Sequence, residues 1–175
     1  MSSPVLVACV GNLLRHDDGF GVAVARELER RGLPAGVDLI ETGIGGMSVV
    51  QQLMNGYRAL VVVDAVDRGA PAGTLWVLTP EVEDPAAIDH EEWRNLFQNL
   101  HLAEPHRVFL LARSLGVLPP IVRIVGCQPG DIDTMDEQLS PPVAGAVPIA
   151  ADRVEAILDT LVAPVAAGAS DQEDI

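Results

Sequence analysis

"VACVGNLLRHDDGFGVAVARELERRG" (residues 7–32) is the stretch that decides the fold. Its apolar beginning predicts a buried strand, and its second half has apolar residues on one helical face and ends at Gly32, a favourable helix C-terminus. Two acids, Asp17 and Asp18, lie side by side where the strand gives way to the helix. Either they cap the helix and interact with its dipole, or they bind a cation.

The composition predicts one domain with an aliphatic core. The chain has 175 residues, of which 49% are hydrophobic and only 3% aromatic. Its formal net charge is -14, from 25 acids and 11 bases, and every base is arginine. This charge argues against binding to nucleic acid or to an anionic membrane, and it favours a cation or a protein with a basic patch as partner.

The cysteines and the N-terminus indicate a cytoplasmic protein. Cys9 and Cys127 each end an apolar strand-like run, and we expect two buried free thiols in a reducing compartment. The first residues lack a basic region followed by a long apolar segment, so no signal peptide is predicted. No uninterrupted apolar run approaches the roughly 18 residues of a membrane helix.

Short apolar runs alternate with amphipathic segments, which predicts an α/β fold. We expect a three-layer α/β/α sandwich around a mostly parallel twisted sheet of about five strands. A single domain over residues 1–163 and a disordered acidic tail over residues 164–175 are expected. The predicted strands cover residues 5–10, 37–42, 59–66, 73–78 and 120–127, and the predicted helices cover residues 18–32, 46–56, 104–116 and 140–163.

Polar residues follow the predicted strands. In parallel sheets, sites form beyond the carboxyl ends of strands, where the Asp17-Asp18 pair and Asp64 are expected. Asp18, Asp64 and one of the four histidines could bind a divalent transition metal. Taken singly, Asp64 could instead cap the turn that follows it, although Asp67 can serve as well. The spacing leaves these alternatives open.

Common catalytic signatures are missing. The chain has no G-x-G-x-x-G, no phosphate-binding loop, no G-x-S-x-G, no H-E-x-x-H and no C-x-x-C. These absences argue against nucleotide enzymes, serine hydrolases of the elbow type and proteins with a resident zinc site. Carboxylates and histidines remain as the candidate chemical groups.

Five segments in order resemble the hydrogenase maturation endopeptidases, which remove the C-terminal extension of the large subunit of nickel-iron hydrogenases. The resemblance covers about residues 4–163, and Thr42 stands where the family has the first glycine of a glycine-rich loop. The matching segments are "GNLLRHDDGFGV" (11–22), "ETGIGGMSVV" (41–50), "VVVDAVDRGAPAGTL" (61–75), "IVRIVGCQP" (121–129) and "EQLSPPVAGAV" (137–147).

The resemblance implies which residues bind metal. Carried over, the nickel ligands are Asp18, Asp64 and His101, because "HLAEPHRV" (101–108) is similar to a histidine segment of some members. His106 is the competing histidine. The nickel is implied to arrive with the large-subunit precursor, already held by cysteine thiolates, and to serve as the recognition feature.

The resemblance also implies how a peptide bond is cut. Catalysis would rest on Asp18, Asp64 and Asp17, with water activated by the nickel or by a carboxylate such as Asp18 or Asp17. The backbone of Gly43, Gly45 and Gly46 would lie close to the bound peptide. The expected protein is a cytoplasmic monomer; whether it is an aspartic-type or a metal-dependent peptidase stays open. The alternative function is a noncatalytic module that binds nickel or a small ligand.

Overall fold

A computed structural model describes residues 4–43, 46–89, 91, 94 and 105–162 of the chain. Its five-stranded sheet has the order β2-β1-β3-β5-β4, and β4 alone runs antiparallel to its neighbour. The predicted mostly parallel sheet is therefore confirmed. The strands are β1 (Val5–Val10), β2 (Val37–Thr42), β3 (Ala59–Ala65), β4 (Leu75–Leu78) and β5 (Ile121–Cys127).

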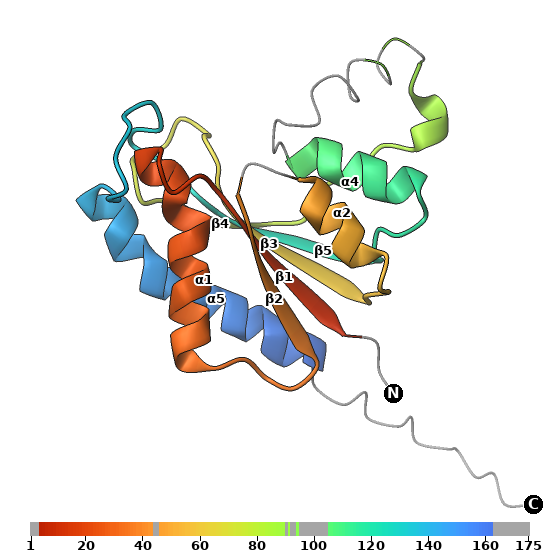
Figure 1. Ribbon diagram of the computed structural model, residues 1–175, viewed down its shortest axis with the longest axis horizontal. Coiled ribbons are helices and arrows are strands. Elements are labelled where there is room, and N and C mark those ends of the chain that lie inside the picture. Colours follow the sequence, from red (N-terminus) through yellow and green to blue (C-terminus); the bar gives the residue numbers. More distant parts are fainter. Residues whose placement is uncertain (1–3, 44–45, 90, 92–93, 95–104, 163–175) are drawn as a thin grey trace, which may run out of the picture.

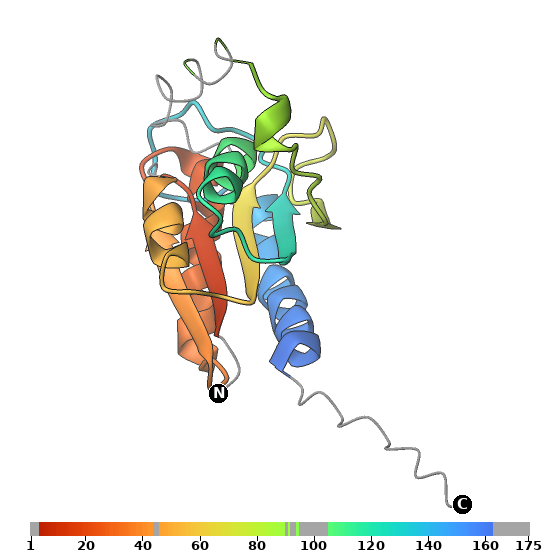
Figure 2. The ribbon, with the colours of Figure 1, turned by 90° about the vertical axis from the view of Figure 1, so that its right-hand side faces the viewer.

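Helices cover both faces of the sheet, which confirms the three layers. Figure 1 shows α1 and α5 together on one side and α2 and α4 on the other; in Figure 2, α2 and α4 stand in front of the strands. The helices are α1 (Phe20–Arg31), α2 (Met47–Leu53), α4 (Pro105–Ser114) and α5 (Pro141–Val162), and short 3-10 turns are η1 (His16–Gly19) and η2 (Pro85–Ala87).

β1 is apolar at every position because both faces of the sheet are covered there, and β3 departs from this pattern only at Asp64. In β1, Val5, Val7 and Cys9 pack toward α1 and α5, whereas the alternate residues pack toward α2 and α4. This is the usual pattern of a buried parallel strand. Both cysteines are buried and free, as expected. Within the described segments, no helix is long and apolar enough to cross a membrane.

The first helix begins later than the sequence predicts. It starts at Phe20, and its N-cap is Gly19, which makes no side-chain capping hydrogen bond. The two aspartates lie in η1, upstream of the helix. The capping explanation for Asp17 and Asp18 is therefore wrong, and their positions need another reason.

Gly21 brings the start of α1 against the sheet. A Cβ atom at this position would lie 2.0 Å from the carbonyl oxygen of Val10 and 2.7 Å from that of Val63. Only a glycine permits this approach, because the obstructing atoms are backbone. The consequence is that η1, and the aspartates in it, lie against the carboxyl ends of β1 and β3.

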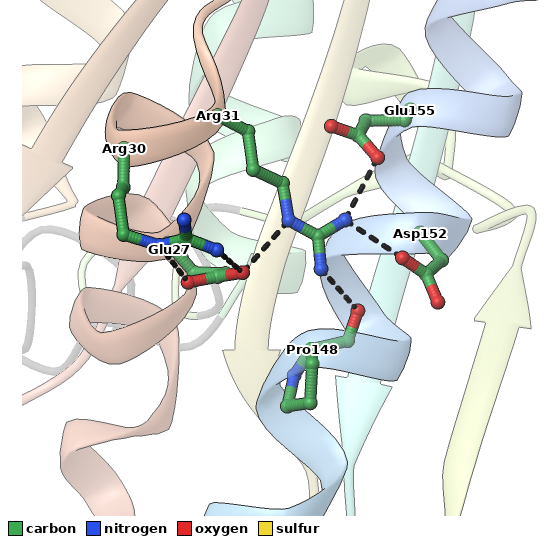
Figure 3. Close-up of polar contacts among 6 residues, drawn as sticks. All are labelled: Glu27, Arg30, Arg31, Pro148, Asp152 and Glu155. Atoms are coloured by element: carbon green, nitrogen blue, oxygen red, sulfur yellow. Dashed lines mark hydrogen bonds and ion pairs between the residues drawn. The ribbon is translucent and has the colours of Figure 1, made fainter.

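Arg31 connects the two helices on one face of the sheet (Figure 3). Its guanidinium donates to Glu27 of α1 and, across the helix interface, to Asp152 and Glu155 of α5, with N–O distances of 2.7 to 2.8 Å. It also donates to the carbonyl oxygen of Pro148, which lies inside α5 without ending it. A network that shares one guanidinium among several acceptors contributes more than an isolated surface pair.

Replacing Arg31 with glutamine is expected to lower the midpoint of thermal unfolding more than replacing Arg30 does. Within the described part of the chain, Arg30 pairs only with Glu27 on its own helix, so its loss leaves the contact between α1 and α5 intact. Thermal melts of R31Q and R30Q in low and high salt check this, since salt should shrink the difference. Equal midpoints at low salt would contradict it.

Candidate functional site at the carboxyl edge of the sheet

Asp18 and Asp64 come from neighbouring strand ends and lie close enough to repel each other. Asp64 is the next-to-last residue of β3, with 6% of its surface exposed, and η1 packs against this strand. Burial raises the pKa of Asp64 well above its ordinary value, and the charge of Asp18 raises it further. The opposing hydrogen bond from the Ala65 amide does not cancel these effects.

Asp18 is half-buried and only partly compensated. Its Oδ2 accepts a hydrogen bond of 3.2 Å from the amide of Asn12. Burial raises the pKa of Asp18, and the Asn12 hydrogen bond and the charge of Arg15 offset this only in part. Among the described residues, neither Asp18 nor Asp64 forms an ion pair. Arg15 acts on Asp18 only from a distance, because its guanidinium forms an ion pair with Asp133.

Asp17 points to a different set of partners. It is fully buried, and its carboxylate accepts hydrogen bonds from the amides of Gly130, Asp131 and Ser140 and from the Ser140 hydroxyl, at 2.7 to 3.1 Å. Burial by itself would raise the pKa of Asp17, but these donors outweigh it and hold the pKa below its ordinary value. Asp17 thereby fastens the β5–α5 connection to η1.

The glycine-rich segment lies beyond β2. Gly43 has open space where a Cβ would be, whereas a Cβ on Gly46 would lie 2.3 Å from Cγ2 of Val108. Gly45 lies outside the described residues. Thr42, at the end of β2, is buried, and its hydroxyl has no hydrogen-bond partner in the described part of the chain. Sequence reasoning noted Thr42 only as a departure from the family pattern.

The histidine predicted as the third metal ligand lies outside the residues that the structure describes. His101 lies outside the described residues, and its role stays a prediction. His106 is exposed in the first turn of α4. His16 is half-buried, with an unusual φ of 47° and a buried Nδ1 that has no partner among the described residues. Within that same set, no three metal-binding side chains form a group.

Gln128 organises the turn after β3, a role that the sequence did not reveal. Its side-chain oxygen accepts from the amides of Arg68 and Ala70 at 2.8 and 3.2 Å, and its side-chain nitrogen donates to Asp67 at 2.8 Å. Asp67 also accepts from the amide of Gly69. Asp67 is thus the acid that caps this turn. The capping role is therefore not needed to explain Asp64, which lies near Asp18.

The sequence profile of the hydrogenase maturation protease family matches residues 22–157 of the chain. The "Hydrogenase expression/formation protein HupD" of Rhodobacter capsulatus is 35% identical over 147 residues, which are 83% of this chain and 67% of the relative. The HupD protein of Rhizobium leguminosarum is 30% identical over 88% of this chain and 73% of its own length.

Solved structures that resemble this chain point to the same family. The hydrogenase maturating endopeptidase HybD from E. coli has a TM-score of 0.71 and 29% identity, over 90% of this chain and 93% of its own. A hydrogenase 2 maturation peptidase from a Thaumarchaeota archaeon has a TM-score of 0.65 and 32% identity, over 89% of this chain and 98% of its own.

Proposed function

The chain belongs to the hydrogenase maturation protease family, and on this premise we propose that it is the endopeptidase that removes the C-terminal extension from the large-subunit precursor of a nickel-iron hydrogenase. The observation that carries the proposal is the pair of carboxylates, Asp18 and Asp64, at the carboxyl edge of the sheet. Within the described residues neither carboxylate forms an ion pair, and such a site suits a substrate that brings a cation with it.

We propose that Asp18 and Asp64 bind the nickel ion carried by the precursor. Carboxylate oxygens complement thiolate ligands from the substrate, and an imidazole is a suitable third ligand from this protein. His101 is our choice for that ligand, and His106 is the alternative. Three protein ligands would be enough to hold the precursor by its metal and to position the peptide bond that follows.

The protein's own groups then serve the hydrolysis in different ways. Each of Asp18 and Asp64 has two carboxylate oxygens, so one oxygen can bind the nickel while the other accepts a proton from water. Asp17 is a positioning residue in this proposal, because its oxygens already accept four hydrogen bonds. The backbone at Gly43 has the open space that an extended peptide needs.

The surface beside the pair suits a protein substrate. Leu14 and Met135 are exposed by 51% and 74%, and they line a hollow of about 460 Å³ together with Asp136 and Glu137. Exposed apolar side chains with acids around them fit a partner whose contact surface is apolar with a basic border. We place the encounter in the cytoplasm, with the protease as a monomer.

Incubation with nickel-loaded precursor, followed by mass spectrometry, tests the proposal. The expected product is a large subunit shortened by one C-terminal peptide, and nickel-free precursor should stay intact. D18N should lose processing, while D159N, which removes an exposed charge on α5, should retain it. Nickel binding with unchanged precursor mass would contradict the proposal and favour a noncatalytic nickel-binding module.

A further inference from the structure

A hollow of about 320 Å³ lies at the opposite end of β5 from the aspartate pair, and we propose that it binds a small anion that carries carboxylate or phosphate groups. Among the described residues, its wall includes two arginines, Arg113 and Arg123, and no acidic side chain. This composition is unusual in a chain whose formal net charge is -14. The inference is independent of the proteolytic function.

The offset between two strands forms the hollow. β4 ends at Leu78, which pairs with Ile124, so residues 121–123 of β5 extend past the end of β4. The chain leaves β4 through Thr79 and Pro80 and passes the C-terminal end of α4 at Val82. Pro119 and Pro120 close the wall before β5 begins. The hollow is therefore built from three backbone segments that the sheet and α4 hold in place.

Both arginines are held by the backbone around the hollow. The Arg113 guanidinium donates to the carbonyl oxygen of Val82, and the Arg123 guanidinium donates to that of Val122 at 2.8 Å. Neither forms an ion pair within the described residues. A guanidinium has five N–H donors, so each arginine keeps donors for a ligand after its carbonyl contact.

The local charge favours an anion. Glu81 and Glu83 flank Val82 in sequence, but they are exposed and do not line the hollow. Arg113 lies in the last turn of α4, where the helix dipole contributes about half a negative charge. The two positive charges of Arg113 and Arg123 exceed the partial negative charge of the helix dipole. Planar guanidinium groups bind carboxylate and phosphate through paired hydrogen bonds, which selects these groups over halides.

The volume limits the ligand to a small molecule. About 320 Å³ is at the lower end of the range of small-molecule pockets. Inorganic phosphate, pyrophosphate and citrate are suitable probes, because they separate the phosphate group from the carboxylate group. Each is titrated into the full chain by calorimetry at constant ionic strength, with chloride as the balancing anion.

We expect saturable binding of at least one probe to the wild-type protein, and at least tenfold weaker binding by R113Q and by R123Q. R153Q is the matched control: Arg153 is exposed on α5 and does not line the hollow, so its loss removes the same charge and should leave affinity unchanged. Preference for pyrophosphate would identify a phosphate ligand, and preference for citrate a carboxylate ligand; both support the proposal.

Amide chemical shifts of the wild-type protein provide a second measurement that does not depend on the variants folding. The bound probe should shift the amides of Val82, Gly116 and Arg123. Absence of saturable binding below about 10 mM for all three probes would overturn the proposal. Equal weakening by R153Q, or shifts confined to the carboxyl edge of the sheet, would overturn it as well.

Discussion

Replacing Asp64 with asparagine is expected to abolish processing of the precursor and, at neutral pH, to make the protein more stable. Processing should fall by at least about a thousandfold, because the variant lacks one carboxylate of the pair that we propose binds the cation and accepts a proton. The free energy of unfolding at pH 7 should rise by about 1 kcal/mol, as commonly occurs when a strained functional group is removed.

The stability gain follows from the direction of the pKa shift. Burial and the charge of Asp18 raise the pKa of Asp64 in the folded state, so the folded protein holds this proton more tightly than the unfolded chain does. The wild-type protein is therefore penalised as the pH rises from the ordinary aspartate pKa, about 3.9, through the raised value. Asparagine has no charge to lose, so D64N avoids this penalty.

Urea unfolding of the wild type and D64N at pH 4 and pH 7 measures the effect. The stability advantage of D64N should be larger at pH 7 than at pH 4. D159N is the control, because Asp159 is exposed on α5 and its loss should change stability little at either pH. A D64N protein that is less stable than the wild type at pH 7 would show that the carboxylate is compensated, contrary to the pair that we describe.

Replacing Asp17 with alanine is expected to lower the free energy of unfolding by about 3 kcal/mol. The substitution removes the acceptor for three backbone amides and one hydroxyl, and buried donors without an acceptor cost about 1 to 3 kcal/mol each before the structure relaxes. Processing should fall too, because η1 also contains Asp18 and would no longer be fastened to the β5–α5 connection.

The contribution of Asp17 to the free energy of unfolding depends on pH in the opposite direction from that of Asp64. The donors around Asp17 lower its pKa in the folded state, so its stabilising contribution is complete above the ordinary aspartate pKa of about 3.9. It is lost as the pH falls through the lowered value. Unfolding of the wild type and D17A at pH 3 and pH 7 should show convergence at acid pH. A constant difference would mean that packing, and not the charge, makes the contribution.

Much of the sheet could be predicted from local patterns. The largely apolar runs at residues 5–10 and 59–66 indicate strands buried on both faces, and alternation with helices indicates a parallel sheet. The convergence of Asp18 and Asp64 follows from that topology, because β1 and β3 are neighbours. The antiparallel direction of β4 could not be predicted, since four residues carry no directional signal.

Long-range contacts account for what the sequence did not reveal. The partners of Asp17 are more than a hundred residues away in the chain, so two adjacent aspartates looked equivalent. The same applies to Gln128, whose partners precede it by some 60 residues. The need for Gly21 arises from the carbonyl groups of two strands, which only the folded backbone brings together. The assignment of His101 still rests on its segment alone.

Because the aspartate pair lies over the middle strands, a segment at the outer edge of the sheet can be exchanged for that of a related protease. β1 and β3 are flanked by β2 and β5, so changes at the outer strands need not move Asp18 and Asp64. Chimeras that receive the segment after β2 from another protease should acquire different client contacts while Asp18 and Asp64 keep their geometry. The outer edge of the sheet is therefore the place to redesign client contacts without moving the aspartate pair.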